Sequence, residues 1–243
     1  MTQENSPHAL SAAQVAGLNA VATSTLTHQL QQRGIRSTFL SGLKPLHPQL
    51  RMVGRARTLR YVALREDVQS QYASGLNAQR RVVESMRPGD VLVIEARGVP
   101  DAATIGDIYA TRAFKLGATG IVTDGALRDT PAIADMHMPV YHFASHGATY
   151  GRQHMPFSVD EAITCAGVFV VPGDVIVGDG EGVVVIPQAL VDDVLRDALA
   201  QEERERFALE RVTAGEPTIG LFPLSKERQG EFEQWQKAQR GEQ

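Results

Sequence analysis

The chain has 243 residues, of which 43% are hydrophobic and 21% charged, with a net charge of −4 and a pI near 6.0. This length predicts one large domain with one substantial core, and the small negative charge gives no general attraction to nucleic acid, whose binding depends on neutralising phosphates. No segment approaches the roughly 20 apolar residues of a membrane helix, and residues 1–8 are polar without the layout of a signal peptide, so we expect a cytoplasmic protein that does not engage a membrane.

The first predicted element is an amphipathic helix over residues 11–33, within an N-terminal helical segment 10–34. Its apolar residues recur close to a helical period, at Val15, Leu18, Val21, Leu26 and Leu30. Ser11 and Gln14 are spaced as a capping box, and Gly34 suits the end of the helix. The pattern predicts a single uninterrupted helix.

A turn-rich stretch over 41–48 leads into the central part of the chain, about residues 50–190. Residues 53–64 have the pattern of a strand, and a helix is expected over about 68–86.

Two later segments resemble each other, Arg87-Pro-Gly-Asp-Val and Val171-Pro-Gly-Asp-Val. Proline followed by glycine suits a tight turn, and in both segments a β-branched strand comes next. The second segment continues through Gly180 and Gly182 into another valine-rich run, which predicts a hairpin. The pair indicates two equivalent turns at the start of two strands.

Between these two segments, helices and strands alternate. We expect a helix over 107–116 that ends at Gly117, a short buried strand over 120–123, a loop over 124–130 and a strand over 139–143.

The C-terminal region, residues 188–243, is predicted to be a helix followed by a tail. Apolar residues at helical spacing start after Gln188, and the tail contains Phe232 and Trp235 among charges. The whole chain therefore predicts an α/β fold in one domain, with a mixed sheet between N- and C-terminal helical extensions.

Several residues that could carry chemistry have a simpler structural explanation. Cys165 lies in an apolar run and is expected to be a small buried hydrophobe. Asp179 and Glu181 lie in a glycine-rich hairpin, where acidic residues usually serve the turn, and this stretch lacks the helix and Lys-Ser/Thr of a nucleotide loop. Four histidines are scattered over loops, which disfavours a histidine metal site: His137, His142, His146 and His154.

The most informative window begins at Gly106-Asp107, where a helix is expected to start. Glycine lets a ligand approach the backbone closely, and the free N–H groups of the first turn, at Asp107, Ile108 and Tyr109, would suit a carboxylate or a phosphate. A plain helix cap is the alternative explanation.

The window ends at Asp124-Gly-Ala-Leu-Arg-Asp129, which places Arg128 beside two carboxylates. Ligand sites of open α/β sheets usually lie beyond the carboxyl ends of the strands, where this segment is expected. On spacing alone, a structural ion pair is an equally good explanation.

Together these segments resemble the RraA-like family, which includes 4-hydroxy-4-methyl-2-oxoglutarate aldolases and the regulator of ribonuclease E activity. The resemblance rests on Gly106-Asp107, on Arg128-Asp129 at matching spacing, and on the downstream Pro-Gly-Asp-Val and Gly-Val-Val-Val-Ile-Pro segments. It covers about residues 10–220. It implies an α/β/α-type sandwich related to swivelling domains, in homotrimers or dimers of trimers with interfacial active sites.

Carried over to this chain, the resemblance implies that Asp129 ligates Mg²⁺ or Mn²⁺, with water in most of the remaining coordination shell. Arg128 would bind the pyruvyl group and stabilise an enolate, while backbone N–H groups of Ile108 and Tyr109, next to Gly106, hold the substrate carboxylate. Asp107 would position a water for proton transfer.

The family's site is completed by an acidic residue of a neighbouring subunit, for which Glu202 and Glu203 are the candidates. The implied function is a metal-dependent pyruvate aldolase acting on a small 2-oxo acid, with possible oxaloacetate decarboxylation. Two alternatives stay open: a regulator that binds a ribonuclease or another protein, and a metal-dependent dehydratase or hydrolase of a 2-oxo acid.

Overall fold

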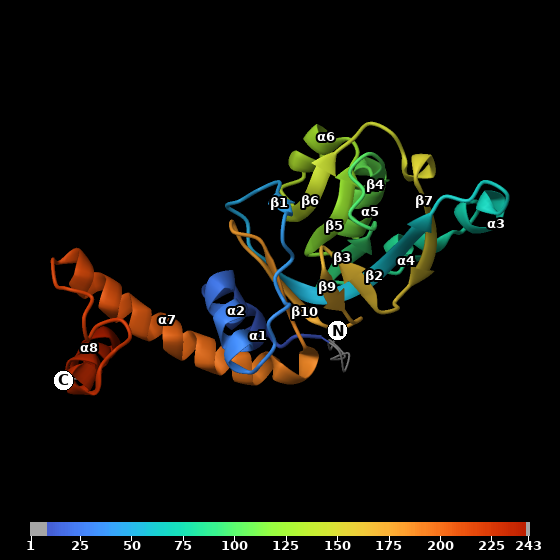
Figure 1. Ribbon diagram of the computed structural model, residues 1–243. Coiled ribbons are helices and arrows are strands. Elements are labelled where there is room, and N and C mark those ends of the chain that lie inside the picture. The colour runs from blue at the N-terminus through green and yellow to red at the C-terminus, as the bar shows by residue number, and fades with distance from the viewer. Residues whose placement is uncertain (1–8, 242–243) are drawn as a thin grey trace.

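The computed structural model describes residues 9–241, and its central element is a nine-stranded mixed sheet (Figure 1). The main strand order is β1-β6-β5-β3-β2-β10-β11, with β4 added beside β5 and β7 beside β2. The strands are β1 (Lys44–Pro45), β2 (Met52–Ala63), β3 (Asp90–Glu95), β4 (Ala103–Ile105), β5 (Gly120–Leu127), β6 (Val140–Ser145), β7 (His154–Val159), β10 (Val175–Gly178) and β11 (Val183–Ile186).

Parallel and antiparallel pairs occupy different parts of this sheet. Strands β2, β3, β5 and β6 pair in parallel, and so do β4 and β5. The pairs β2–β10, β10–β11, β2–β7 and β1–β6 are antiparallel. The predicted α/β fold with a mixed sheet is confirmed, and the valine-rich hairpin is β10–β11.

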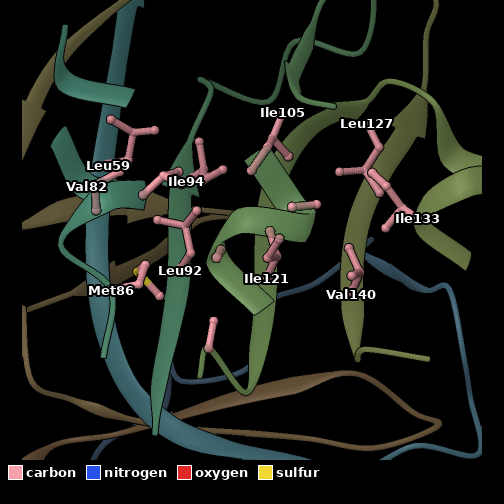
Figure 2. Close-up of a cluster of buried hydrophobic side chains, with 14 of the residues drawn as sticks. Leu59, Val82, Met86, Leu92, Ile94, Ile105, Ile121, Leu127, Ile133 and Val140 are labelled. Atoms are coloured by element: carbon pink, nitrogen blue, oxygen red, sulfur yellow. The ribbon is translucent and has the colours of Figure 1, made fainter. Parts of the chain in front are cut away.

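The side chains of β3 show how the sheet is covered, because successive residues face opposite sides. Leu92 and Ile94 pack against α4 (Ala78–Glu84), α5 (Asp107–Lys115) and α6 (Thr130–Ala134) in the cluster of Figure 2. Val91 and Val93 pack on the other side, against a small hairpin of β8 (Ile163–Cys165) and β9 (Val168–Val170). In the centre of the sheet, one cover is therefore helical and the other is a hairpin.

The N-terminal helical segment is two helices, so the prediction of one helix was wrong. The helices are α1 (Ala12–Ala20) and α2 (Thr23–Gln32), and the predicted Ser11–Gln14 capping box is present. Tertiary contacts satisfy the backbone where the helix breaks: Ala22 N–H donates to Glu202, and Thr23 N–H donates to Asp179. Periodicity alone could not show these distant acceptors.

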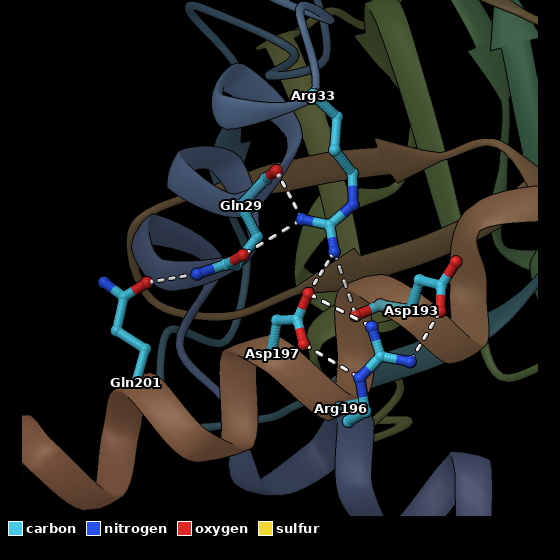
Figure 3. A network of polar contacts seen from close by, with 6 residues as sticks. All are labelled: Gln29, Arg33, Asp193, Arg196, Asp197 and Gln201. Carbon is cyan, nitrogen blue, oxygen red and sulfur yellow. Dashed lines mark hydrogen bonds and ion pairs between the residues drawn. The ribbon is translucent and has the colours of Figure 1, made fainter.

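Helix α7 (Val191–Thr213) covers the other end of the sheet together with α1 and α2. The three helices pack through an apolar cluster onto β10 and β11. A polar network joins α2 to α7, in which Arg33 pairs with Asp197 and Gln29 donates to Gln201 (Figure 3). None of the helices within residues 9–241 is long and apolar enough to cross a membrane.

The outer half of α7 extends away from the sheet, and helix α8 (Gln229–Arg240) folds back onto it (Figure 1). Phe207, Leu221 and Phe232 form a small separate core, and Trp235 packs against it. The predicted C-terminal helix and tail thus form a helical arm with its own apolar contacts.

Two further predictions of element length were wrong. The helix expected over 68–86 is divided into α3 (Gln69–Ala73) and α4, because Gly75 adopts a left-handed conformation with φ +58° and Asn77 caps the new start. Strand β5 continues to Leu127, so most of the predicted loop 124–130 is strand. Residues 1–8, which the sequence predicts not to be a signal peptide, lie outside the described residues.

The two Pro-Gly-Asp turns are equivalent, as predicted. Gly89 and Gly173 both have positive φ, at +87° and +92°. In each turn the aspartate carboxylate accepts the N–H of the residue three positions earlier at 2.8 Å. The strands that follow, β3 and β10, lie on either side of β2.

Candidate active site

Parallel pairing of β4 and β5 brings the two parts of the sequence window together. The two strands run side by side to Ile105 and Leu127, and Arg128 N–H then donates to Ile105 C=O at 3.0 Å. Helix α5 starts just after β4, and α6 starts just after β5. The residues that leave these two carboxyl ends therefore share one edge of the sheet.

The pocket at this edge, here called the Asp129 pocket, has a volume of about 240 Å³. It is lined by Gln79, Ala103, Thr104, Ile105, Gly106, Asp107, Ile108, Tyr109, Arg128, Asp129, Thr149 and Tyr150. All the residues predicted for the site, apart from Glu202 and Glu203, line this pocket.

Gly106 is needed because Asp129 lies directly against it. The backbone of Gly106 is extended, so its φ of −116° would suit any residue. A Cβ added here, however, would lie 2.8 Å from Asp129 Oδ2, closer than a Cβ normally approaches an oxygen. The missing side chain is what allows the first turn of α5 and the Asp129 carboxylate to be neighbours.

The first turn of α5 offers N–H donors to the pocket, as any helix start does. Asp107 N–H and Tyr109 N–H have no acceptor within the described part of the chain, whereas Ile108 N–H donates to Asp107 Oδ1 at 2.8 Å. Two of the three predicted donors are thus free, and the third is engaged by its neighbour. The arrangement suits an anionic group at the start of α5.

Asp129 holds its carboxylate toward solvent on a strained backbone. Its φ of +56° is uncommon for a residue with a side chain, and its side chain makes no capping hydrogen bond to α6. Arg128 Nε lies 3.5 Å from Asp129 Oδ2, and the two side chains are 45% and 37% exposed. This is a loose, accessible ion pair, which a ligand could rearrange without breaking the fold.

Asp124 has a different role from the one its motif suggested. It is 5% exposed, and its carboxylate accepts backbone N–H groups from Ala96, Gly98 and Ala166. Burial raises the pKa of this carboxyl, while the three hydrogen bonds act in the opposite direction. Asp124 joins β5 to the segments after β3 and β8, and it does not line the pocket.

Sequence reasoning missed Gln79, Thr104, Thr149 and Tyr150. Gln79 and Tyr61 both donate to Thr104 C=O, at 2.7 and 2.8 Å, and so hold β4 in place. Gln79 was hidden because it fell inside a predicted continuous helix, and no local pattern marks the other three. Burial raises the pKa of Tyr150, which keeps its hydroxyl neutral.

Glu202 and Glu203 lie on α7, far from the Asp129 pocket of the same chain (Figure 1). Glu202 Oε1 accepts from Ala22 N–H and from Thr25 Oγ1, and Glu203 Oε2 accepts from Gln236 Nε2. Their predicted role concerns a neighbouring subunit, so it stays a prediction.

The other residues singled out in the sequence are distributed as follows. Cys165 is fully buried in β8, as predicted, and burial raises its pKa. Asp179 and Glu181 form the β10–β11 turn, as predicted, and Asp179 also caps α2. His142 is buried in β6, and the pKa of buried His154 is lowered to about 4, chiefly by desolvation.

The donor set around Asp129 limits what kind of metal could bind there. Among residues 9–241, no three His, Cys, Asp or Glu side chains are grouped to hold a metal ion. A cation on Asp129 would therefore take most of its ligands from water or from a bound substrate. One exposed carboxylate with that shell suits Mg²⁺ or Mn²⁺, and it does not suit zinc, which favours several protein ligands.

Comparison with known proteins places this geometry in context. A family model described as RraA-like: Aldolase/RraA matches residues 23–185, which include the whole strand-end part of the pocket and exclude Glu202 and Glu203. A protein of Halalkalibacterium halodurans named "Putative 4-hydroxy-4-methyl-2-oxoglutarate aldolase" is 36% identical over 183 residues, covering 73% of this chain and 81% of its own. A Pseudomonas aeruginosa protein of the same name is 36% identical over 102 residues, 42% of this chain and 62% of its own.

A solved structure is similar over most of the chain. Streptomyces coelicolor RraAS2, described as an unusual member of the RNase ES inhibitor RraA protein family, superposes with a TM-score of 0.74 at 30% identity. The similarity covers 82% of this chain and 96% of that one.

Proposed function

The chain belongs to the RraA-like family, and from this premise we propose that it is a divalent-metal-dependent lyase that cleaves a 4-hydroxy-2-oxo acid to release pyruvate. The observation that carries the proposal is the shared pocket of the α5 start and the Arg128-Asp129 turn. A helix start that suits a carboxylate, a cationic side chain and a free carboxylate are what a 2-oxo acid lyase needs within one pocket.

The substrate carboxylate is placed at the first turn of α5. The free N–H groups of Asp107 and Tyr109 lie at the positive end of the α5 helix dipole and can donate to this anion. Ile108 N–H becomes a third donor if the Asp107 side chain turns away from it.

Asp129 would hold the metal ion, and Mg²⁺ or Mn²⁺ fits its single exposed carboxylate. When bound, the ion supplies Lewis acidity to the 2-oxo group. Arg128 then has a function beyond pairing with Asp129, because its guanidinium offsets negative charge that grows on the same keto oxygen.

Cleavage follows the ordinary course of a retro-aldol reaction. The C4 hydroxyl gives up its proton, the C3–C4 bond breaks, and C4 becomes the carbonyl carbon of the leaving product. The bond electrons pass to C3 and C2, forming pyruvate enolate, which takes a proton at C3. Asp107, the first residue of α5, positions the water that carries these protons. Loss of CO₂ from oxaloacetate gives the same enolate, so decarboxylation belongs to the same proposal.

We place the working site at an interface in a homotrimer or a dimer of trimers. Within one chain the Asp129 pocket is open and has few acidic groups, so a neighbour's acidic side chain would add a proton-transfer group. Glu203 suits this role better than Glu202, whose carboxylate already caps α2 in its own chain.

A regulatory protein is the second candidate, since RraAS2 is described as a relative of RNase ES inhibitors. Binding to a ribonuclease would place no demand on the Asp129 pocket. The close contact of Gly106 with Asp129 and the free α5 donors support the lyase instead.

The test is pyruvate release from 4-hydroxy-4-methyl-2-oxoglutarate and from oxaloacetate, measured with Mg²⁺, with Mn²⁺ and with EDTA. Turnover that requires the metal is the expected result. If metal binds but neither compound turns over, the lyase proposal fails and a dehydratase or hydrolase of another 2-oxo acid becomes the next assay. If metal does not bind either, the regulatory candidate replaces it.

A further inference from the structure

The matched Pro-Gly-Asp turns, which the proposed reaction does not use, frame a second and larger pocket. Its volume is about 790 Å³, and both turns line it together with the start of β2. Arg55 of β2 lies between the turns, because its register partners are Asp90 on one side and Val175 on the other. We call this cavity the Arg55 pocket.

The Arg55 pocket is at the opposite end of the sheet from the Asp129 pocket. Asp90 and Thr119 stand where β3 and β5 begin, whereas the Asp129 pocket lies where β4 and β5 end. A ligand here would therefore not compete with the 2-oxo acid for the same atoms.

Arg55 is a half-buried cation without a counter-charge among residues 9–241. Within residues 9–241 no carboxylate lies within 4.0 Å of its guanidinium, and its pKa is lowered by desolvation. Its neighbour Arg57 is different, since Asp160 and Asp90 neutralise it. A cation that has lost water and gained no anion is costly unless a ligand supplies the anion.

One edge of the Arg55 guanidinium is also free. Nη1 donates to Gly173 C=O at 3.0 Å, while Nε is buried and has no partner among the described residues. Nη2 likewise has no protein acceptor in that part of the chain. Nη2, unlike Nε, is not among the buried atoms, so it can donate to an oxygen of a carboxylate or phosphate.

The rest of the pocket is mainly apolar. Leu10, Val15, Val53, Pro88 and Pro172 contribute to its walls. The charged residues that line it besides Arg55 are Arg87 and Arg57, the latter together with its partners Asp90 and Asp160. We propose that the Arg55 pocket is a second ligand site, which binds a small organic anion through its oxyanion group on Arg55 and its apolar body between the two Pro-Gly-Asp turns.

Calorimetric titration of the full-length protein tests this site with three probes. Hexanoate carries an oxyanion on an apolar body, 1-hexanol has the body alone, and inorganic phosphate has the oxyanion alone. We expect hexanoate to bind and hexanol to bind much more weakly. If phosphate binds and this binding depends on Arg55, the oxyanion group suffices for binding. If phosphate does not bind although hexanoate does, the apolar body is also required.

Variants separate this pocket from the active site. Arg55→Met should weaken hexanoate binding by roughly tenfold or more, because a charge-assisted contact with Nη2 is lost. Arg128→Ala should leave the hexanoate affinity unchanged, and the exposed Arg81→Met serves as a matched control. Arg55→Lys keeps the charge without the planar guanidinium, so it should bind hexanoate at intermediate strength. If Arg55→Met does not fold, the hexanoate affinity of Arg55→Lys tests the role of Arg55.

The proposal is overturned if wild-type protein does not bind hexanoate at about 10 mM, a concentration that reveals even weak sites. It is equally overturned if hexanol binds as tightly as hexanoate, or if the affinity is lost in Arg128→Ala and kept in Arg55→Met. These results do not depend on lyase activity, so the two proposals can fail separately.

Discussion

The interior of β5 and the turn that follows it each carry an aspartate, Asp124 and Asp129. Asp124 is 5% exposed and accepts three backbone N–H groups from other segments. The Asp129 side chain is 37% exposed, lies on a left-handed backbone and makes only a loose contact with Arg128 at 3.5 Å. One carboxylate accepts three hydrogen bonds from the fold, and the other keeps its capacity for a ligand.

The role of an aspartate is therefore not assigned by its residue type or by the motif that contains it. A buried carboxylate is tolerated only where hydrogen bonds replace its water, and such a group stabilises the structure. An exposed carboxylate that no neighbour uses costs the fold little and stays available to a ligand. Changes to the two residues should therefore separate stability from activity.

The largest expected effect is on catalysis, at the turn. Asp129→Ala and Arg128→Ala should each lower kcat/KM for pyruvate release by about 10³-fold, because each removes a group that acts on the developing enolate. Their free energy of unfolding should stay within about 0.5 kcal/mol of wild type, as for other exposed substitutions. Steady-state assays and urea unfolding measure both quantities.

Asp135→Ala is the matched control, since Asp135 directly follows α6, is exposed and does not line the pocket. Activity in this variant should equal wild type. Full activity in Asp129→Ala would remove the basis for the metal site.

The next effect is on stability, in the strand interior. Asp124→Ala removes the acceptor of three backbone N–H groups, a buried one at Ala96 and two part-buried ones at Gly98 and Ala166, and should cost about 3 kcal/mol of unfolding free energy. Asp124→Asn keeps one acceptor oxygen and should cost less. Urea unfolding measures the loss, and the folded fraction should keep its kcat. A variant as stable as wild type would show that these N–H groups find other partners.

A smaller effect on activity is expected at Gly106. Gly106→Ala puts a Cβ 2.8 Å from Asp129 Oδ2, so the carboxylate must move, and kcat/KM should fall about 30-fold. Stability should change little, because the φ of −116° accepts alanine. In Gly147→Ala no atom lies within 4 Å of the added Cβ, so this control should keep full activity. Equal activity of the two variants would contradict the close packing at the site.

The smallest effect is a dependence of stability on pH that arises in the interior at His154. Its pKa is lowered from 6.5 to about 4, mainly by burial and also by Arg97. The unfolded chain therefore takes up the proton first, and stability falls as pH drops below 6.5, with the loss complete near pH 4. We expect a loss of about 1–2 kcal/mol from this group.

Urea unfolding at pH 7 and pH 4.5 measures this loss in wild type and in His154→Phe, which keeps a ring beside Tyr61. The variant should lose less stability between the two pH values than wild type does. His137→Gln, at an exposed position, should behave as wild type. A variant with the same pH dependence as wild type would assign the effect to other groups.

Features that depend on neighbouring residues could be predicted from the sequence. The capping box of Ser11 and Gln14, the two Pro-Gly turns, the valine-rich hairpin and the start of α5 all follow from local chemistry. The sequence also indicated Gly106, Asp107, Arg128 and Asp129, because the first pair begins a predicted helix, the second pair follows a predicted strand, and both resemble a known family.

Features that depend on distant partners could be seen only in the folded chain. The break between α1 and α2 is fixed by Glu202 and Asp179, which lie more than 150 positions away in the sequence. The role of Asp124 differs from that of Asp129 because Asp124 accepts N–H groups from the segments after β3 and β8. The packing around Arg55 leaves it without an anion in the described part of the chain. Periodicity and spacing report on contacts within a few residues, whereas burial and hydrogen-bond satisfaction arise only when the chain has closed on itself.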